Sequence, residues 1–142
     1  MPTAKDVAQY IVEKKGRITT IKLQKLVYYC QAWSLVWDDK PLFDDEIQAW
    51  ANGPVVPSLF QAHKGSYSID IIPGGNSASL TKEQKETVDV IIRDYGDKSS
   101  QWLVDLTHLE DPWKDARGSC RPGERCVNVI TLDSMANYYS GI

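Results

Sequence analysis

The segment from Ile18 to Pro57 constrains the fold of this 142-residue chain most strongly. Apolar side chains recur there at spacings of three and four, which predicts one long amphipathic helix whose apolar stripe faces a core. The stripe consists of Leu23, Leu26, Val27, Cys30, Trp33 and Trp37. An acidic patch and the sequence Gly53-Pro54-Val55-Val56-Pro57 follow the helix. A chain organised around such a helix is expected to be predominantly α-helical.

Capping and breaking residues predict the other elements. Helices are expected from Thr3 to Gly16, from Thr19 or Thr20 to Trp37, from Pro57 to Gly65, from Thr81 to Gly96, from Ser99 to Asp111-Pro112, and from Thr131 onward. Residues 46–51 and 67–72 resemble short strands that would pair with each other, Gly53-Pro54 a rigid bend, and residues 117–125 a solvated loop. The sequence predicts a single compact helical domain over residues 1–142, with room for one short two-stranded β element.

The charge pattern argues against nucleic acid as the main partner. The net charge is −3 and the isoelectric point is near 5.3, whereas proteins that bind the phosphate backbone usually carry a basic excess. Residues 1–25 hold six basic and two acidic side chains, and residues 38–50 hold one basic and five acidic ones. These blocks could pair within the fold or steer a protein partner electrostatically, and the sequence leaves both interpretations open.

The N-terminus and the cysteines predict a cytoplasmic protein that does not enter a membrane. No apolar stretch follows a basic start, and the apolar runs are too short to cross a bilayer. Three cysteines do not make a disulfide framework, so a reducing compartment is expected. Cys30 lies in the helical stripe, while Cys120 and Cys126 are expected to be ordinary loop thiols.

No set of residues predicts catalysis. The only histidines are His63 and His108, and a mid-helix Cys30 would be buried and inert. Cys120 and Cys126 lack the short CxxC turn of common zinc sites, and no glycine-rich phosphate loop is present. We therefore expect no enzyme activity, no metal and no cofactor. His108 is expected to end a helix, with a partner contact as the alternative.

A DNA-binding helix-turn-helix motif is the main alternative interpretation of the first two helices. The first two predicted helices are joined by a short turn that contains Gly16, and Lys22 and Lys25 lie near the start of the second. Trp33 and Trp37 make that second helix long and core-bound, however, and the rest of the chain is mostly acidic. Specific nucleic-acid binding is therefore not expected, and a small transcription regulator stays an alternative.

A partner-binding surface is the remaining prediction. One helical row diverges from the apolar stripe and would form an exposed basic strip edged by an aromatic ring, and proline-stiffened bends would present tryptophans as exposed anchors. The predicted partner-binding residues are Lys22, Lys25, Tyr29, Trp50, Gly53, Pro54, His108 and Trp113.

Several motifs along the chain together resemble the Panacea antitoxin domain. They are the segment from Lys22 to Trp33, Pro41-Leu42-Phe43, Ala49-Trp50, Gly53-Pro54-Val55-Val56-Pro57, Tyr95-Gly96, Leu106-Thr107-His108 and Pro112-Trp113. The resemblance is collinear over about residues 3–140, and Cys30 stands where alanine is expected. The family includes phage-associated GepA-type proteins and SocA-type proteolytic adaptors.

The resemblance implies a mainly helical antitoxin of a toxin-antitoxin system, phage-associated or carried by a prophage, that binds and neutralises a cognate protein toxin in the cytoplasm. A proteolytic adaptor that delivers the toxin to an ATP-dependent protease is the alternative within the same class. The family's shared residues form no active site, and no DNA-binding domain is expected before Thr3.

Overall fold

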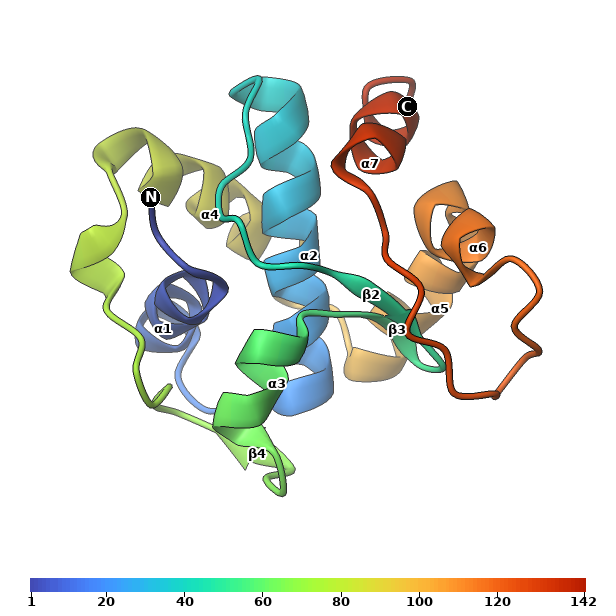
Figure 1. Cartoon of the computed structure of the whole chain (residues 1–142). Coiled ribbons are helices and arrows are strands. Elements are labelled where there is room, and N and C mark those ends of the chain that lie inside the picture. Colours follow the sequence, from blue (N-terminus) through green and yellow to red (C-terminus); the bar gives the residue numbers. More distant parts are fainter.

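The computed structural model describes residues 1–142 and places one helix, α2, at the centre of the molecule (Figure 1). The helices are α1 (Ala4–Lys15), α2 (Thr20–Trp37), α3 (Pro57–His63), α4 (Lys82–Tyr95), α5 (Ser100–Leu109), α6 (Asp111–Arg117) and α7 (Leu132–Tyr139), with a 3₁₀ turn at Ser77–Ser79. The strands are β1 (Ile18–Thr19), β2 (Gln48–Trp50), β3 (Gly53–Val55) and β4 (Ser68–Ile69). The predominantly α fold is confirmed.

Capping bonds confirm five of the six predicted helix starts. Thr3 and Asp6 form a reciprocal capping box at α1, and Thr81 and Gln84 form another at α4. Single side-chain caps begin the other long helices, from Thr19 at α2, Ser99 at α5 and Thr131 at α7. No helix is both long and apolar enough to cross a lipid bilayer.

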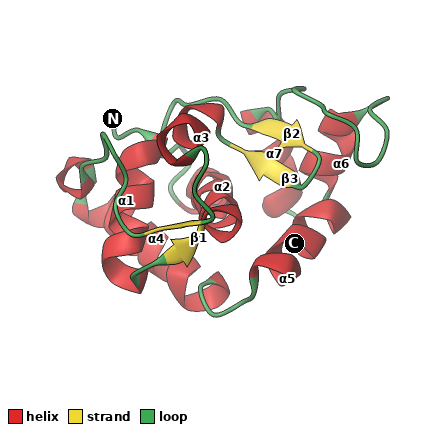
Figure 2. Cartoon of the chain, turned by 90° about the horizontal axis from the view of Figure 1, so that it is seen from below, coloured by secondary structure: helices red, strands yellow, loops and turns green.

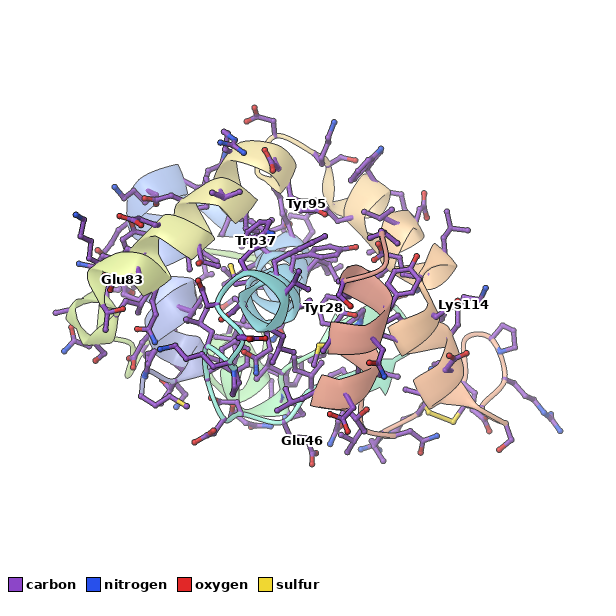
Figure 3. All side chains as sticks on the ribbon, turned by 90° about the horizontal axis from the view of Figure 1, so that it is seen from above. Tyr28, Trp37, Glu46, Glu83, Tyr95 and Lys114 are labelled. Atoms are coloured by element: carbon purple, nitrogen blue, oxygen red, sulfur yellow. A yellow bond between two sulfur atoms is a disulfide. The ribbon has the colours of Figure 1, made fainter.

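The core surrounds α2 because this helix is covered on several faces. In Figure 1, α1 and α4 lie on one side of α2, and α5, α6 and α7 lie on the other. Figure 3 shows Tyr28 in the space between α2 and α7, where its hydroxyl lies 3.0 Å from that of Tyr139. The predicted stripe is buried from Leu23 to Cys30, but Trp33 is only partly buried and Trp37 is 47% exposed. The stripe therefore reaches solvent at the end of α2.

The predicted pairing of residues 46–51 with 67–72 is wrong. Instead β2 pairs with β3, and β1 pairs with β4, as two separate antiparallel pairs (Figure 2). Gly53 has φ +116°, a conformation open to glycine, so the chain reverses directly after Trp50. Gly53-Pro54 is consequently part of a strand. A short hairpin also closes a much smaller loop than the predicted pairing would, which costs less conformational entropy.

The segment after α6 differs from the predicted loop in two respects. Arg117 ends α6 and is buried, and its guanidinium donates to the carbonyl of Ala49 at 3.2 Å. Cys120 and Cys126 form a disulfide, with Cα atoms 6.1 Å apart, so the expectation of free loop thiols is wrong. Turns within residues 117–126 bring the two cysteines together, which their spacing alone did not indicate.

Removing this disulfide should lower the free energy of unfolding by about 2 kcal/mol, because the bond closes only a short loop of the unfolded chain. The matched comparison is wild type against Cys120→Ser/Cys126→Ser, each melted with and without dithiothreitol. The reductant should lower the melting temperature of the wild type to that of the double variant and leave the variant unchanged. A wild type that does not respond would show that the thiols are unpaired in solution.

Candidate partner-binding site

The prediction of an exposed strip on α2 is wrong for Lys25 and Tyr29. Lys25 is 1% exposed and Tyr29 is fully buried, while Lys22 is partly buried. Because α2 is enclosed by α4, α5, α7 and β3, the helical row beside its apolar stripe is covered as well. Gly53 and Pro54 are also buried, and the remaining predicted residues are partly buried: these are Trp50, His108 and Trp113. No predicted residue is a fully exposed anchor.

Most of these residues nevertheless meet around the β2–β3 hairpin. The Lys25 ammonium donates to the carbonyl of Pro54 at 3.3 Å. The indole N–H of Trp113 donates to the carbonyl of Trp50 at 2.8 Å. The ring of His108 stacks on Trp113, with centroids 4.0 Å apart and planes 8° apart. Residues from α2, α5, α6 and the hairpin are therefore held together by these contacts.

Tyr29 and Lys22 lie outside this group. The Tyr29 hydroxyl donates to the Glu110 carboxylate at 2.6 Å, and the Tyr139 hydroxyl donates to the same oxygen at 2.8 Å. Burial raises the pKa of Glu110, and these two hydroxyls partly offset the increase. Lys22 instead lines a hollow of about 290 Å³ that includes Lys15, where burial and the Lys15 charge lower its pKa.

The basic and acidic blocks do not form ion pairs with each other. Lys15 pairs with Asp97 at 3.3 Å, and Arg17 pairs with Asp70 at 3.0 Å. The remaining ion pair joins Arg93 to its neighbour Asp94. Direct ion pairing of the two blocks within the fold is therefore wrong as an explanation of the charge asymmetry.

Lys25 has an unusual environment for a lysine. No carboxylate lies within ion-pair distance, and burial lowers the pKa of its ammonium to about 7. Gly53 leaves the space that this side chain occupies, because a Cβ there would lie 2.6 Å from Lys25 Cε and 2.9 Å from Thr107 Oγ1. Sequence reasoning named Lys25 and Gly53 but assigned both to the surface.

A pocket of about 230 Å³ lies between α2, α3 and the hairpin. Its lining residues are Thr20, Ile21, Gln24, Lys25, Trp50, Ala51, Asn52, Val55, Phe60 and His63. Gln24 and His63 were missed as members of the site. Gln24 Nε2 lies 2.9 Å from His63 Nε2, and Gln24 Oε1 accepts from the Val56 N–H at 2.9 Å. The available signal was the pair Gln24-Lys25, which interrupts the apolar sequence between Leu23 and Leu26.

Two further hollows flank the tip of the hairpin. One of about 380 Å³ is lined by Trp50, Ala51, Gly123, Arg125, Cys126 and Val127. Another of about 300 Å³ is lined by Ile21, Asn52, Ser100, Gln101, Val104, Asp105 and His108. We define the hairpin surface as Ile21, Trp50, Ala51, Asn52 and His108, the residues around which these three hollows lie. Ile21 is 41% exposed and borders two of them.

The hairpin surface offers recognition chemistry. Its hollows are lined by a mixture of apolar and polar side chains, which can supply both contact area and specific hydrogen bonds. The buried Nε2 of His108 has no hydrogen-bond partner within the chain. No three His, Cys, Asp or Glu side chains come together as metal ligands, and burial raises the pKa of the fully enclosed Cys30 thiol.

Comparison with known proteins points to one family. Residues 23–114 match the model of the SocA-like antitoxin family with its Panacea domain. Antitoxin SocA of Caulobacter vibrioides is 28% identical over 127 residues, covering 78% of this chain and 68% of that protein. No solved structure matches the chain. The matched region contains α2 from Leu23 onward, the hairpin, α5 and the first half of α6. It includes Trp50, Ala51, Asn52 and His108 of the hairpin surface, whereas Ile21 lies just before it. The chain therefore belongs to the SocA-like Panacea-domain family of antitoxins.

Proposed function

We propose that this antitoxin neutralises a cognate protein toxin by binding it directly through the hairpin surface, without catalysing a reaction. The observation that carries the proposal is the ring of three hollows around Trp50, Ala51 and Asn52, with the exposed Ile21 between two of them. Tryptophans such as Trp50 are enriched among the few residues that dominate binding energy at protein interfaces.

The position of α2 favours a protein partner over DNA. A helix-turn-helix would place this helix in a major groove, yet 12 of its 18 residues are buried. Lys25, one of the two lysines on which that alternative depended, is enclosed by the fold. The overall net charge of −3 also gives little electrostatic support for phosphate contacts.

An Ile21→Glu substitution should weaken toxin binding by about 30-fold or more, because it places a charge at the centre of an apolar contact. Leu132→Glu is the matched control, since Leu132 is 43% exposed and lines a different hollow. Both variants are co-expressed with the cognate toxin, and the affinity of each purified variant for that toxin is measured by calorimetry.

Loss of rescue and of binding in Ile21→Glu alone would support the proposal. Equal rescue by both folded variants would place the interface elsewhere. The amount of toxin in the rescued cells is measured as well: an unchanged amount agrees with direct binding, whereas toxin that disappears only when a protease is active would favour the adaptor alternative.

A further inference from the structure

Lys25 differs from the other buried charged residues in how few partners it has. Those residues are Asp6, Glu110 and Arg117. Asp6 accepts two backbone N–H groups, Glu110 accepts two phenol hydroxyls, and Arg117 donates to two carbonyls. Lys25 makes one hydrogen bond, to Pro54, although an ammonium carries three donors. The fold thus leaves hydrogen-bonding capacity at Lys25 unused.

The Lys25 side chain lies at the wall of a pocket. Lys25 lines the 230 Å³ pocket, whose other walls include the apolar side chains of Ile21, Trp50, Val55 and Phe60. The pocket opens at Ile21 and the exposed Asn52. The remaining polar lining residues are Thr20, Gln24, Asn52 and His63, so Lys25 is the one cationic side chain of the pocket. The complementary group is therefore a short apolar stem that ends in an anion.

We propose that this pocket receives an acidic side chain of the toxin, an aspartate or glutamate whose carboxylate pairs with the Lys25 ammonium. The identity of the partner rests on the proposed function, whereas the chemistry of the pocket does not. Folding has already removed Lys25 from water, so binding adds only the desolvation of the incoming carboxylate. The pocket therefore contains the cation of an ion pair, and the partner would supply the anion.

The groups that surround Lys25 do not include an anion that could pair with it. They are the Pro54 carbonyl of β3, the amide of Gln24 on α2, the Thr107 hydroxyl and His108 on α5, and His63 on α3. The Gln24 amide is bonded to His63 and Val56, and the Thr107 hydroxyl donates to Val104. Burial lowers the pKa of both histidines, and the charge of Lys25 lowers it further. An incoming carboxylate would be the single anion in contact with Lys25.

The test uses two small probes that differ only in charge, 3-phenylpropionate and 3-phenylpropanamide, added to the full-length protein without toxin. Binding is followed by NMR at the Trp50 indole N–H, and the pKa of Lys25 is followed at its Cε resonance. Lys25→Met removes the charge but keeps a similar length. Lys22→Met is the control, because Lys22 lies outside the pocket.

For the wild type and Lys22→Met, the carboxylate should bind at least fivefold more tightly than the amide and raise the pKa of Lys25 by one unit or more from about 7. Its affinity should fall about tenfold per pH unit between pH 7 and the pKa of Lys25 in the complex, because binding in this range requires proton uptake. Lys25→Met should bind both probes equally. If that variant does not fold, the comparison of the two probes and the pH dependence in the wild type still test the proposal.

Equal affinity of the wild type for both probes, or an unchanged pKa of Lys25, would overturn the proposal, as would no binding of either probe. These outcomes are separate from the neutralisation experiment, because no toxin is present. Probe binding combined with unimpaired neutralisation by a folded Lys25→Met variant would show that the pocket binds carboxylates but does not receive the toxin, which also overturns the proposal.

Discussion

Gly53→Ala is expected to lower the free energy of unfolding by roughly 2 to 5 kcal/mol, from backbone strain combined with overpacking. The strain arises because Gly53 has φ +116°, which alanine adopts at a cost. The overpacking arises because the new Cβ would lie 2.6 Å from Lys25 Cε and 2.9 Å from Thr107 Oγ1. Urea unfolding measures the loss, and the same variant should lose the carboxylate preference of the pocket because Lys25 must move.

Gly65→Ala separates the two causes. Gly65 also has a positive φ, of +88°, but no atom lies within 4 Å of the added Cβ, so its loss should be limited to backbone strain of about 1 kcal/mol. Adding Lys25→Ala to Gly53→Ala should recover part of the loss, since it removes the side chain nearest to the new Cβ. Equal losses for Gly53→Ala and Gly65→Ala would show that the space beside Lys25 is not tightly filled.

Glu110→Ala should lower the free energy of unfolding by about 3 to 5 kcal/mol, because it removes the acceptor of two buried phenol hydroxyls. Tyr29 donates to this carboxylate at 2.6 Å and Tyr139 at 2.8 Å, which ties α2 and α7 to the start of α6. Glu110→Gln is the control, since its amide oxygen can accept both bonds and it should lose much less. Similar losses for both variants would show that the hydroxyls do not depend on this acceptor.

The difference in unfolding free energy between the wild type and Glu110→Gln is also expected to depend on pH. Burial raises the pKa of Glu110 in the folded state above its ordinary value of 4.5, so folded Glu110 holds its proton more tightly than unfolded Glu110. Its contribution to stability is therefore fully present below pH 4.5 and declines as the pH rises through the folded pKa. The difference in unfolding free energy between the wild type and Glu110→Gln should fall over this range and then stay constant. A difference that grows with pH would show that the fold favours the carboxylate anion.

The fold class and most helix boundaries could be predicted because they depend on local interactions. Thr3, Thr81 and Ser99 cap helices through bonds to backbone groups three residues away, and Pro57 begins a helix because its missing N–H group is not needed there. The spaced motifs also predicted the family, which the comparison confirmed. The partner-binding role of the predicted residues stays a prediction.

The sequence by itself determined six of the seven helices and the buried part of the α2 stripe, from Leu23 to Cys30, because periodicity and capping act within a few residues. Only the tertiary structure decided which strands pair, which cysteines bond, and that Lys25 and Tyr29 are buried rather than exposed. A helical row is exposed or enclosed according to how many elements surround its helix. For α2 those elements come from the distant segments α4, α5 and α7, whose positions no local pattern encodes.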